Sequence, residues 1–156
     1  MFSGVALALS ELPVELMERH GLRSRVHDRG GEPEVRFLLH ARSRSLPVWL
    51  DGQLQIVRWG NRRGQSRGLP CTAWTWLSTL ETGGWNEREP TAVVIPATMG
   101  LDNGVWFQVR EGIRGVVVHD EQGQPVVYAL CEPASHYYQV MTRGSVWMPV
   151  LLGERI

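Results

Sequence analysis

The sequence predicts a β-rich α+β fold, in which antiparallel strands form a barrel-like mixed sheet accompanied by two or three short helices. Three observations support this. Short apolar segments of strand length recur along the chain, turn residues separate them, and only two segments carry helix signals. With 156 residues, 43% of them hydrophobic and 21% charged, the chain is expected to form one domain over residues 1–156.

The N-terminal third is predicted to contain one helix and one strand. Ser10 is a suitable N-cap for a helix that runs to His20, with acids in its first turn and Gly21 as its stop signal. Residues 22–33 are polar and are expected to form a loop. Apolar side chains then alternate over residues 35–39, which predicts a half-buried strand.

The clearest local signal is a β-hairpin. Two extended segments, residues 46–50 and 53–59, flank Asp51-Gly52, a dipeptide that favours tight hairpin turns. The segment after the hairpin, residues 60–70, is rich in Gly, Arg and Ser. We therefore expect residues 60–70 to be a surface loop.

The remaining chain is predicted to contain one more helix and then strands only. The helix is expected at residues 72–82, ended by Gly83 and Gly84. Residues 120–123 are predicted to be a four-residue hairpin connection. The expected strands span residues 91–95, 104–109, 113–119, 125–131, 137–141 and 147–152.

Charge is distributed unevenly although the formal net charge is zero. Residues 1–18 carry three acids, residues 19–67 carry eleven Arg against four acids, and residues 68–156 carry five Arg against nine acids. Every basic residue is Arg, whose planar guanidinium can bind a phosphate through two hydrogen bonds or stack on a base.

The arginine-rich segment 58–67 is the strongest candidate for a binding site. It has four Arg and no acid, and its glycines would let a ligand approach the backbone. This composition suits the phosphates of a nucleic acid, with Trp59 or its neighbours as a stacking face. The alternative is a solvated loop whose Arg side chains reach acids of the C-terminal half. The candidate nucleic-acid-binding residues are Arg58, Trp59, Asn61, Arg62, Arg63 and Arg67.

Catalytic and metal motifs are few. The sequence contains no phosphate-binding glycine loop, no HExxH segment and no GxSxG segment, so we predict no metal and no cofactor. Cys71, at the start of the second expected helix, and His136 are candidates for a nucleophile and a base. The alternative for these two residues is a packed thiol and a surface His.

No segment suggests a membrane or secreted location. No apolar run reaches about 18 residues, the length of a membrane span, and residues 1–9 lack a basic leader. The two cysteines form no CxxC pair and no disulfide framework. We therefore expect a cytoplasmic protein without membrane partners.

Several short segments resemble one family when their order is considered. The chain is similar to a shortened, divergent member of the SOS-response-associated peptidase (SRAP) family, over roughly residues 45–152. The matching segments are Trp59-Gly60, Ile95-Pro96-Ala97, Gly104-Val105-Trp106, Glu132-Pro133-Ala134 and Met148-Pro149-Val150-Leu151-Leu152.

The resemblance implies a barrel-like fold with a positively charged groove for single-stranded DNA. In that family an N-terminal cysteine links covalently to abasic sites, and an Asn, a Glu and a His line the site. Here the cysteine position is Phe2, the Glu position is Val105 and the His position is Ser145. Asn61 is a candidate for the Asn. None of the three replacements can supply a 1,2-aminothiol or a titratable group, so the covalent chemistry should be absent.

Three hypotheses follow from the sequence. The first is a catalytically degenerate SRAP-like protein that binds single-stranded or damaged DNA non-covalently through its arginine-rich loop. The alternatives are a protein-interaction module of phage or mobile-element origin, and an unrecognised Cys/His hydrolase. The first hypothesis further expects Phe2, Trp59, Val105 and Ser145 to converge on one groove lined by Arg58 and Arg62.

Overall fold

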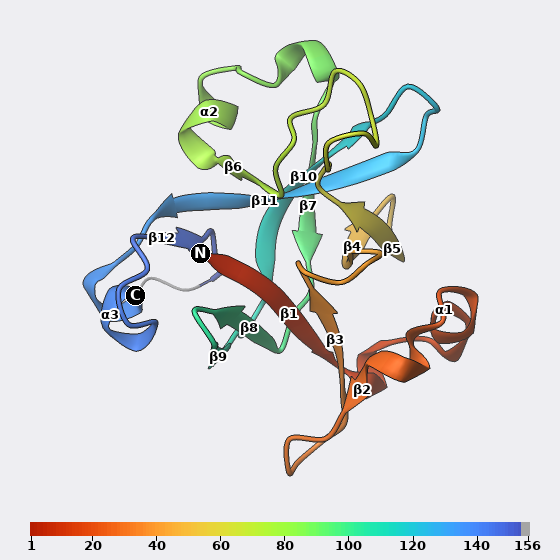
Figure 1. Cartoon of the computed structure of the whole chain (residues 1–156), viewed down its shortest axis with the longest axis vertical. Coiled ribbons are helices and arrows are strands. Elements are labelled where there is room, and N and C mark those ends of the chain that lie inside the picture. The colour runs from red at the N-terminus through yellow and green to blue at the C-terminus, as the bar shows by residue number, and fades with distance from the viewer. Residues whose placement is uncertain (154–156) are drawn as a thin grey trace.

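The computed structural model describes residues 1–153 and has the predicted β-rich α+β architecture: a closed five-stranded mixed barrel, a second, antiparallel sheet and three short α-helices (Figure 1). The two sheets lie on either side of a shared hydrophobic core. Within residues 1–153, none of the helices combines the length and the apolarity that crossing a bilayer requires.

Five strands close the barrel. They pair in the order β10-β7-β4-β5-β11, and β10 also pairs with β11, so the ring is complete. All pairs are antiparallel except β5–β11. Two short strands, β6 (Trp74–Trp76) and β12 (Trp147–Pro149), pair with the C-terminal half of β11. The barrel strands are β4 (Ser45–Leu50), β5 (Gln53–Trp59), β7 (Thr91–Ile95), β10 (Ile113–His119) and β11 (Pro125–Pro133).

The second sheet has β1 at its centre. Its order is β2-β3-β1-β8-β9, and every pair is antiparallel. Its strands are β1 (Phe2–Ala8), β2 (Val26–His27), β3 (Glu34–Leu38), β8 (Met99–Asp102) and β9 (Val105–Gln108). The α-helices are α1 (Val14–Arg19), α2 (Leu77–Glu81) and α3 (His136–Met141), and single 3-10 turns occur at Leu9–Glu11, Leu22–Arg25 and Asn86–Arg88.

Strands β10 and β11 are buried on both faces, which explains their continuous apolar sequences. Val117, Val127 and Ala129 pack into the large core with Trp59 and Phe2. The alternate residues pack into a second, smaller core that the segment following β5 covers with Leu69, Leu77, Leu80 and Trp85. This second core holds the segment in place over the barrel.

The predicted hairpin is confirmed, and the first predicted helix is confirmed with different bounds. Asp51 and Gly52 both have positive φ, as the tight turn requires. The helix begins at Val14 after Pro13, whereas Ser10 lies in the preceding 3-10 turn and caps nothing. The predicted loop 22–33 contains a 3-10 turn and strand β2.

Two other predictions are wrong. Residues 74–76 do not belong to a helix, because they pair with β11 as strand β6, and the helix starts only at Leu77. The expected strand 137–141 is helix α3, whose N-cap Ser135 accepts a 3.1 Å hydrogen bond from the Tyr138 backbone N–H. Tyr138 is buried and Met141, three residues later, is partly buried, while the residues between them are exposed, so the segment buries one face with helical spacing.

The sequence prediction missed the strands β1 and β8. A turn with positive φ at Asn103 and Gly104 joins β8 to β9, which makes this dipeptide a second tight hairpin turn. The strand expected at residues 104–109 therefore starts one residue later, at Val105.

Candidate nucleic-acid interface

The two ends of the arginine-rich loop after β5 lie next to each other. The Gly60 N–H donates to the Val127 carbonyl at 2.7 Å, and the Asn61 N–H donates to the Thr72 carbonyl at 3.0 Å. Gly60 has φ +65° and its α-carbon faces the Thr72 carbonyl oxygen so closely that a Cβ atom would overlap it. The base of the loop is therefore closed by backbone contacts that only glycine allows.

Asn61 organises the loop from the inside. Its side-chain amide donates to the carbonyls of Ser66 and Leu69, each at 3.0 Å, and its side-chain oxygen accepts from the Ser66 N–H at 3.1 Å. Asn61 is 1% exposed. The predicted role of Asn61 in binding a ligand is therefore wrong, because its polar atoms are used within the loop.

Trp59 is also unavailable to a ligand. It is fully buried, its indole N–H donates to the Ala73 carbonyl at 3.0 Å, and its ring lies 5.8 Å from the ring of Phe2. Strand β5 turns this side chain into the large core. The prediction that Trp59 offers a stacking face for a base is wrong for this reason.

Arg62 fastens the loop to the turn that precedes β4. Its guanidinium donates to the carbonyls of Leu39 at 3.1 Å, Ala41 at 2.7 Å and Arg42 at 2.9 Å. In return, the Arg44 guanidinium donates to the Asn61 carbonyl at 3.1 Å. Segments 39–45 and 60–68 therefore form one surface, and Arg62 contributes structure as well as charge.

Arg58 is partly neutralised. Its Nη2 donates to the Ser66 hydroxyl at 2.8 Å, and its Nη1 lies 3.7 Å from the Asp120 carboxylate. The Nε atoms of Arg44 and Arg58 are buried and have no hydrogen-bond partner among the described residues. Burial lowers the pKa of Arg44, and the neighbouring charges of Arg62 and Arg58 lower it further. Positive charge is therefore concentrated where the side chains of Arg44, Arg58 and Arg62 lie close together.

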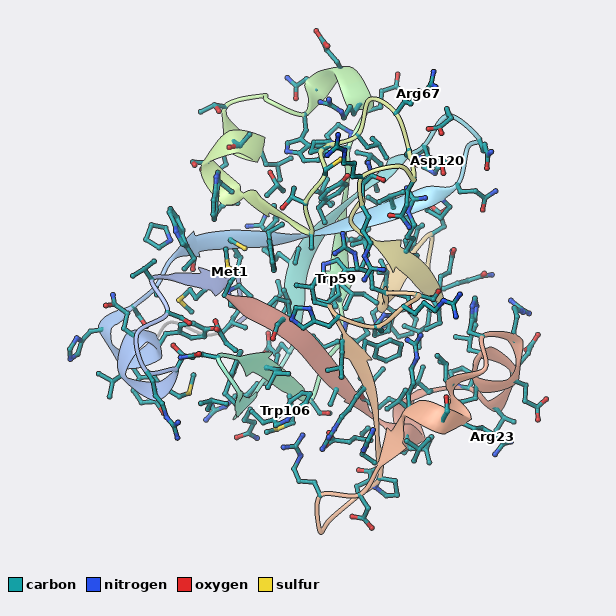
Figure 2. The ribbon with its side chains drawn as sticks, in the orientation of Figure 1. Met1, Arg23, Trp59, Arg67, Trp106 and Asp120 are labelled. Atoms are coloured by element: carbon teal, nitrogen blue, oxygen red, sulfur yellow. The ribbon has the colours of Figure 1, made fainter. Side chains whose placement is uncertain are left out.

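We define the arginine surface by six residues of these two segments. The side chains of Arg42, Arg63 and Arg67 are exposed and form no ion pair within residues 1–153. Within the same range, the acid that lies within ion-pair distance of this surface is Asp120, and Figure 2 shows Arg67 and Asp120 at the same end of the molecule. The arginine surface consists of Arg42, Arg44, Arg58, Arg62, Arg63 and Arg67.

Cys71 and His136 do not form a catalytic pair. Cys71 is exposed and precedes a strand, so no helix N-terminus acts on its thiol. The Cys71 sulfur lies 3.9 Å from the Asn61 amide nitrogen. The neighbouring Pro70 carbonyl accepts from Tyr128 on β11, whereas His136 follows the end of that strand. Within residues 1–153, no hydrogen bond joins the Cys71 thiol to the His136 ring.

A buried carboxylate, Asp102, lies at the centre of a second polar cluster that the sequence prediction missed. Its Oδ1 accepts from the Ser145 hydroxyl at 2.7 Å and lies 2.9 Å from the Met1 ammonium nitrogen. Its Oδ2 accepts from the Tyr138 hydroxyl at 2.6 Å. Burial, and then this bond to Asp102, raises the pKa of Tyr138, so the phenol stays protonated. The Asn103-Gly104 turn beside Asp102 was the available sequence signal.

The positions expected to converge do so only in part. Phe2 and Val105 both pair with Asp102 across the second sheet, Ser145 bonds to its carboxylate, and Trp59 contacts Phe2. They do not line a groove with arginines, because Phe2 and Trp59 are buried and the Arg58 and Arg62 side chains contact other segments.

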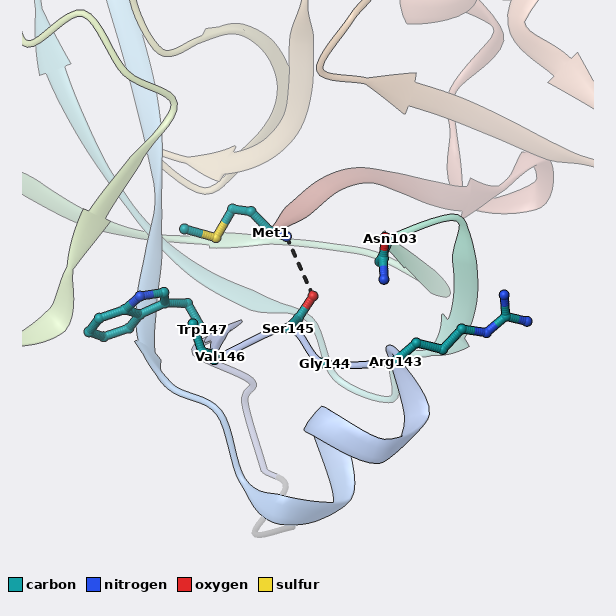
Figure 3. Close-up of a pocket in the computed structure, with 7 residues that line it drawn as sticks. All are labelled: Met1, Asn103, Arg143, Gly144, Ser145, Val146 and Trp147. Carbon is teal, nitrogen blue, oxygen red and sulfur yellow. Dashed lines mark hydrogen bonds between the residues drawn. The ribbon is translucent and has the colours of Figure 1, made fainter.

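An open cavity of about 340 Å³ lies next to this cluster (Figure 3). Within residues 1–153, no group of three or more His, Cys, Asp or Glu side chains is arranged to hold a metal ion. The cavity is lined by Met1, Asn103, Arg143, Gly144, Ser145, Val146 and Trp147.

Comparison of the chain with protein-family models, with curated proteins and with solved structures finds no match in any of the three. The resemblance to the SRAP family therefore stays a prediction based on the short segments named above.

Proposed function

We propose that this protein is a non-catalytic, SRAP-like domain that binds single-stranded nucleic acid through its arginine surface. The observation that carries the proposal is the joining of segments 39–45 and 60–68 by the Arg62 and Arg44 hydrogen bonds. Six guanidinium groups lie on this surface, and Asp120 offsets only one of them. Arg67 lies at the edge of this surface, and the other five arginines do not line the cavity that it shares with the acids Glu87, Glu89, Asp120 and Glu121. A surface on which cations outnumber their paired acids favours a polyanion as its ligand.

We expect the protein to contact the phosphates of the nucleic acid without recognising its bases. Arg42, Arg63 and Arg67 are exposed and can each grip a phosphate through two hydrogen bonds. The loop offers no stacking ring, because Trp59 is buried. Binding should therefore depend strongly on salt and only slightly on base sequence, since phosphate contacts release counterions but carry no sequence information.

The proposal includes the loss of the covalent chemistry that the resemblance implies. Phe2 is fully buried and packs against Trp59 instead of presenting a nucleophile. Val105 and Ser145 replace the acid and the His, and the Ser145 hydroxyl is bonded to Asp102. We expect no stable cross-link between the protein and an oligonucleotide that contains an abasic site.

The test measures the affinity for a labelled single-stranded oligonucleotide by fluorescence anisotropy, between about 50 and 200 mM salt. The test variant is Arg63→Ala with Arg67→Ala, because removing Arg62 would also break three hydrogen bonds to the backbone. The slope of log affinity against log salt should become shallower by about 1.4, or about 0.7 for each lost phosphate contact.

A matched control removes two arginines elsewhere. Arg19→Ala with Arg23→Ala changes the net charge equally, and both side chains pair with glutamates of the α1 region. This control should leave the salt slope unchanged. An absence of binding by the unmodified protein at low salt would contradict the proposal, and so would an equal effect of the two double variants.

A second candidate, the protein-interaction module, is favoured by exposed apolar side chains near α3. Tyr137, Val140 and Val146 are 60%, 66% and 62% exposed. Light scattering at several salt concentrations separates the candidates. A stable oligomer without affinity for the oligonucleotide would support the interaction module.

A further inference from the structure

Strand β4 carries an exposed tryptophan, Trp49, on the outer wall of the barrel. We propose that Trp49 is a stacking platform for a base of the single strand whose phosphates lie on the arginine surface. This inference rests on the proposed function and adds the contact that distinguishes a single strand from a duplex. Every base has a flat face that can stack on an indole, so the platform does not depend on the identity of the base.

The alternation of side chains along β4 turns Trp49 outward. Val48 and Leu50, on either side of it in the chain, are buried in the large core, and successive side chains of a strand point to opposite faces. Trp49 is 49% exposed, and no other tryptophan within residues 1–153 is as exposed. Its indole is therefore accessible to a ligand, whereas that of Trp59 is not.

Neighbouring strands on both sides hold the platform in place, since β4 lies between β5 and β7 (Figure 1). Trp49 is paired with Leu54 on β5 and with Val94 on β7, and directly opposite residues share one face of a sheet. Leu54 and Val94 are partly buried, so the three side chains form an apolar patch on the barrel wall. A ring that is carried by a paired strand loses little conformational freedom when a base stacks on it.

The face of the hairpin that carries Trp49 leads to the arginine surface. Arg58 is paired with Ser45, and Ser45 precedes Trp49 by four residues on β4, so Arg58 and Trp49 lie on the same face. Their separation along the strand is roughly 13 Å. The Arg58 Nη2 donates to the Ser66 hydroxyl at 2.8 Å, which places the arginine-rich loop over that end of the face. A strand of a few nucleotides can therefore contact both the loop and Trp49.

The charges around the platform restrict the kind of ligand that suits it. Cations at one end of the face favour a polyanion, and an exposed indole favours a flat ring. A single-stranded nucleic acid offers both in every nucleotide, whereas a duplex would have to unstack and unpair a base to make this contact. At the other end, exposed Asp51 lies in the turn after β4 and repels a phosphate. The base on Trp49 is therefore expected to belong to the last nucleotide that contacts the protein.

Fluorescence anisotropy with the full chain tests the platform on three labelled probes of equal length: a single-stranded deoxythymidine oligonucleotide, a strand of stable abasic analogues that cannot form a cross-link, and the duplex of the oligonucleotide with its complement. The unmodified protein should bind the abasic strand about tenfold more weakly than the oligonucleotide. Trp49→Leu should weaken the binding of the oligonucleotide by about tenfold and leave the binding of the other two probes unchanged. The salt slope should stay the same, because the phosphate contacts remain.

Three further variants serve as controls. Trp49→Phe keeps a ring and should retain most of the affinity. Trp76→Leu is the matched control, because it removes an exposed tryptophan on β6, and it should leave all affinities unchanged. Arg63→Ala with Arg67→Ala should weaken the binding of all three probes, because it removes phosphate contacts. Thermal unfolding should show that all variants are folded.

A loss that Trp49→Leu causes with the base-bearing single strand alone supports the inference. An effect no larger than that of Trp76→Leu, or an equal loss with the abasic strand, would overturn it and leave the proposed function standing, because phosphate contacts would still explain the binding. A change of oligomeric state in light scattering without a change in affinity would assign the apolar patch to a protein contact and overturn the inference as well. No binding of any probe at low salt would overturn both the inference and the proposed function.

Discussion

The phenol of Tyr138 donates a 2.6 Å hydrogen bond to the carboxylate of Asp102, and both residues are fully buried. Asp102 is the last residue of β8, so the pair connects β8 to α3, and these two elements are far apart in sequence. It holds the helix that the sequence prediction described as a strand. The stability of this end of the fold should therefore depend on the hydrogen bond.

Tyr138→Phe should lower the free energy of unfolding by about 1–3 kcal/mol, because Asp102 Oδ2 would lose its buried partner. The ring itself would keep its edge-on contact with Phe107, at 5.4 Å between centroids. Urea denaturation measures the change. Tyr137→Phe alters an exposed neighbour and should change the stability by less than about 0.5 kcal/mol. Equal effects of the two variants would contradict this role.

Gly60→Ala should destabilise the protein far more than Gly64→Ala. Both glycines have positive φ, but a Cβ atom at Gly60 would overlap the backbone of Thr72 and Ala73, whereas Gly64 has nothing within 4 Å. Strain alone should cost about 1 kcal/mol at Gly64, and the overlap should raise the cost at Gly60 to about 3 kcal/mol or more. Thermal and urea denaturation check the difference, and similar losses would exclude the close approach.

Glu34 should stabilise the fold at neutral pH and lose this effect in acid. Its carboxylate accepts hydrogen bonds from Arg29 at 2.6 and 2.8 Å and from Arg36 at 3.0 Å, and these bonds lower its pKa below the ordinary 4.5. A lowered pKa in the folded state means that the stabilisation is present above pH 4.5 and disappears as the pH falls through the lowered value.

Glu34→Gln should therefore cost about 2 kcal/mol at neutral pH, and the difference from the unmodified protein should shrink as the pH falls below 4.5. The measurement is urea denaturation across this pH range. Glu32→Gln is the control, because Glu32 is exposed and has no ion pair among the described residues. A pH-independent effect of Glu34→Gln would show that packing, and not charge, is responsible.

The two cysteines should differ in reactivity. Cys131 is fully buried, and burial, followed by the charge of Asp102, raises the pKa of its thiol to about 12. A thiol-reactive probe should label exposed Cys71 in the folded protein and Cys131 only after unfolding. Cys71→Ser should remove the native-state labelling. Rapid labelling of Cys131 in the folded protein would contradict its burial.

Local sequence signals were sufficient to predict an element where adjacent residues determine the backbone conformation. Asp51-Gly52 specified a hairpin because both residues tolerate positive φ, and Asn103-Gly104 carries the same signal for the hairpin that was missed. The segment Tyr137–Met141 was ambiguous, because its aromatic and β-branched residues favour strands. Burial of Tyr138 against Asp102 and Phe107 favours the helix there.

The candidate binding site was likewise predicted in part from local sequence and decided in part by tertiary contacts. The excess of Arg between residues 42 and 67 was visible in the sequence, but the sequence could not show which guanidiniums are free. The Arg62 guanidinium donates hydrogen bonds to carbonyls some twenty residues away in the chain, while the side chain of the adjacent Arg63 is exposed. Trp59 lies next to Arg58 in the chain, yet the pleat of β5 sends it to the opposite face, into the core.

The sequence by itself determined the β-rich class, the first hairpin, the concentration of arginines and the absence of a nucleophile at Phe2, because composition and adjacent residues decide these features. Only the tertiary structure decided that Asp102 gathers Tyr138 and Ser145, and that Trp76 stacks on Trp147. The Trp contact joins the two strands that flank the end of β11, and the Asp102 contacts join β8 to α3 and to the segment after it, so both depend on residues that are distant in the chain.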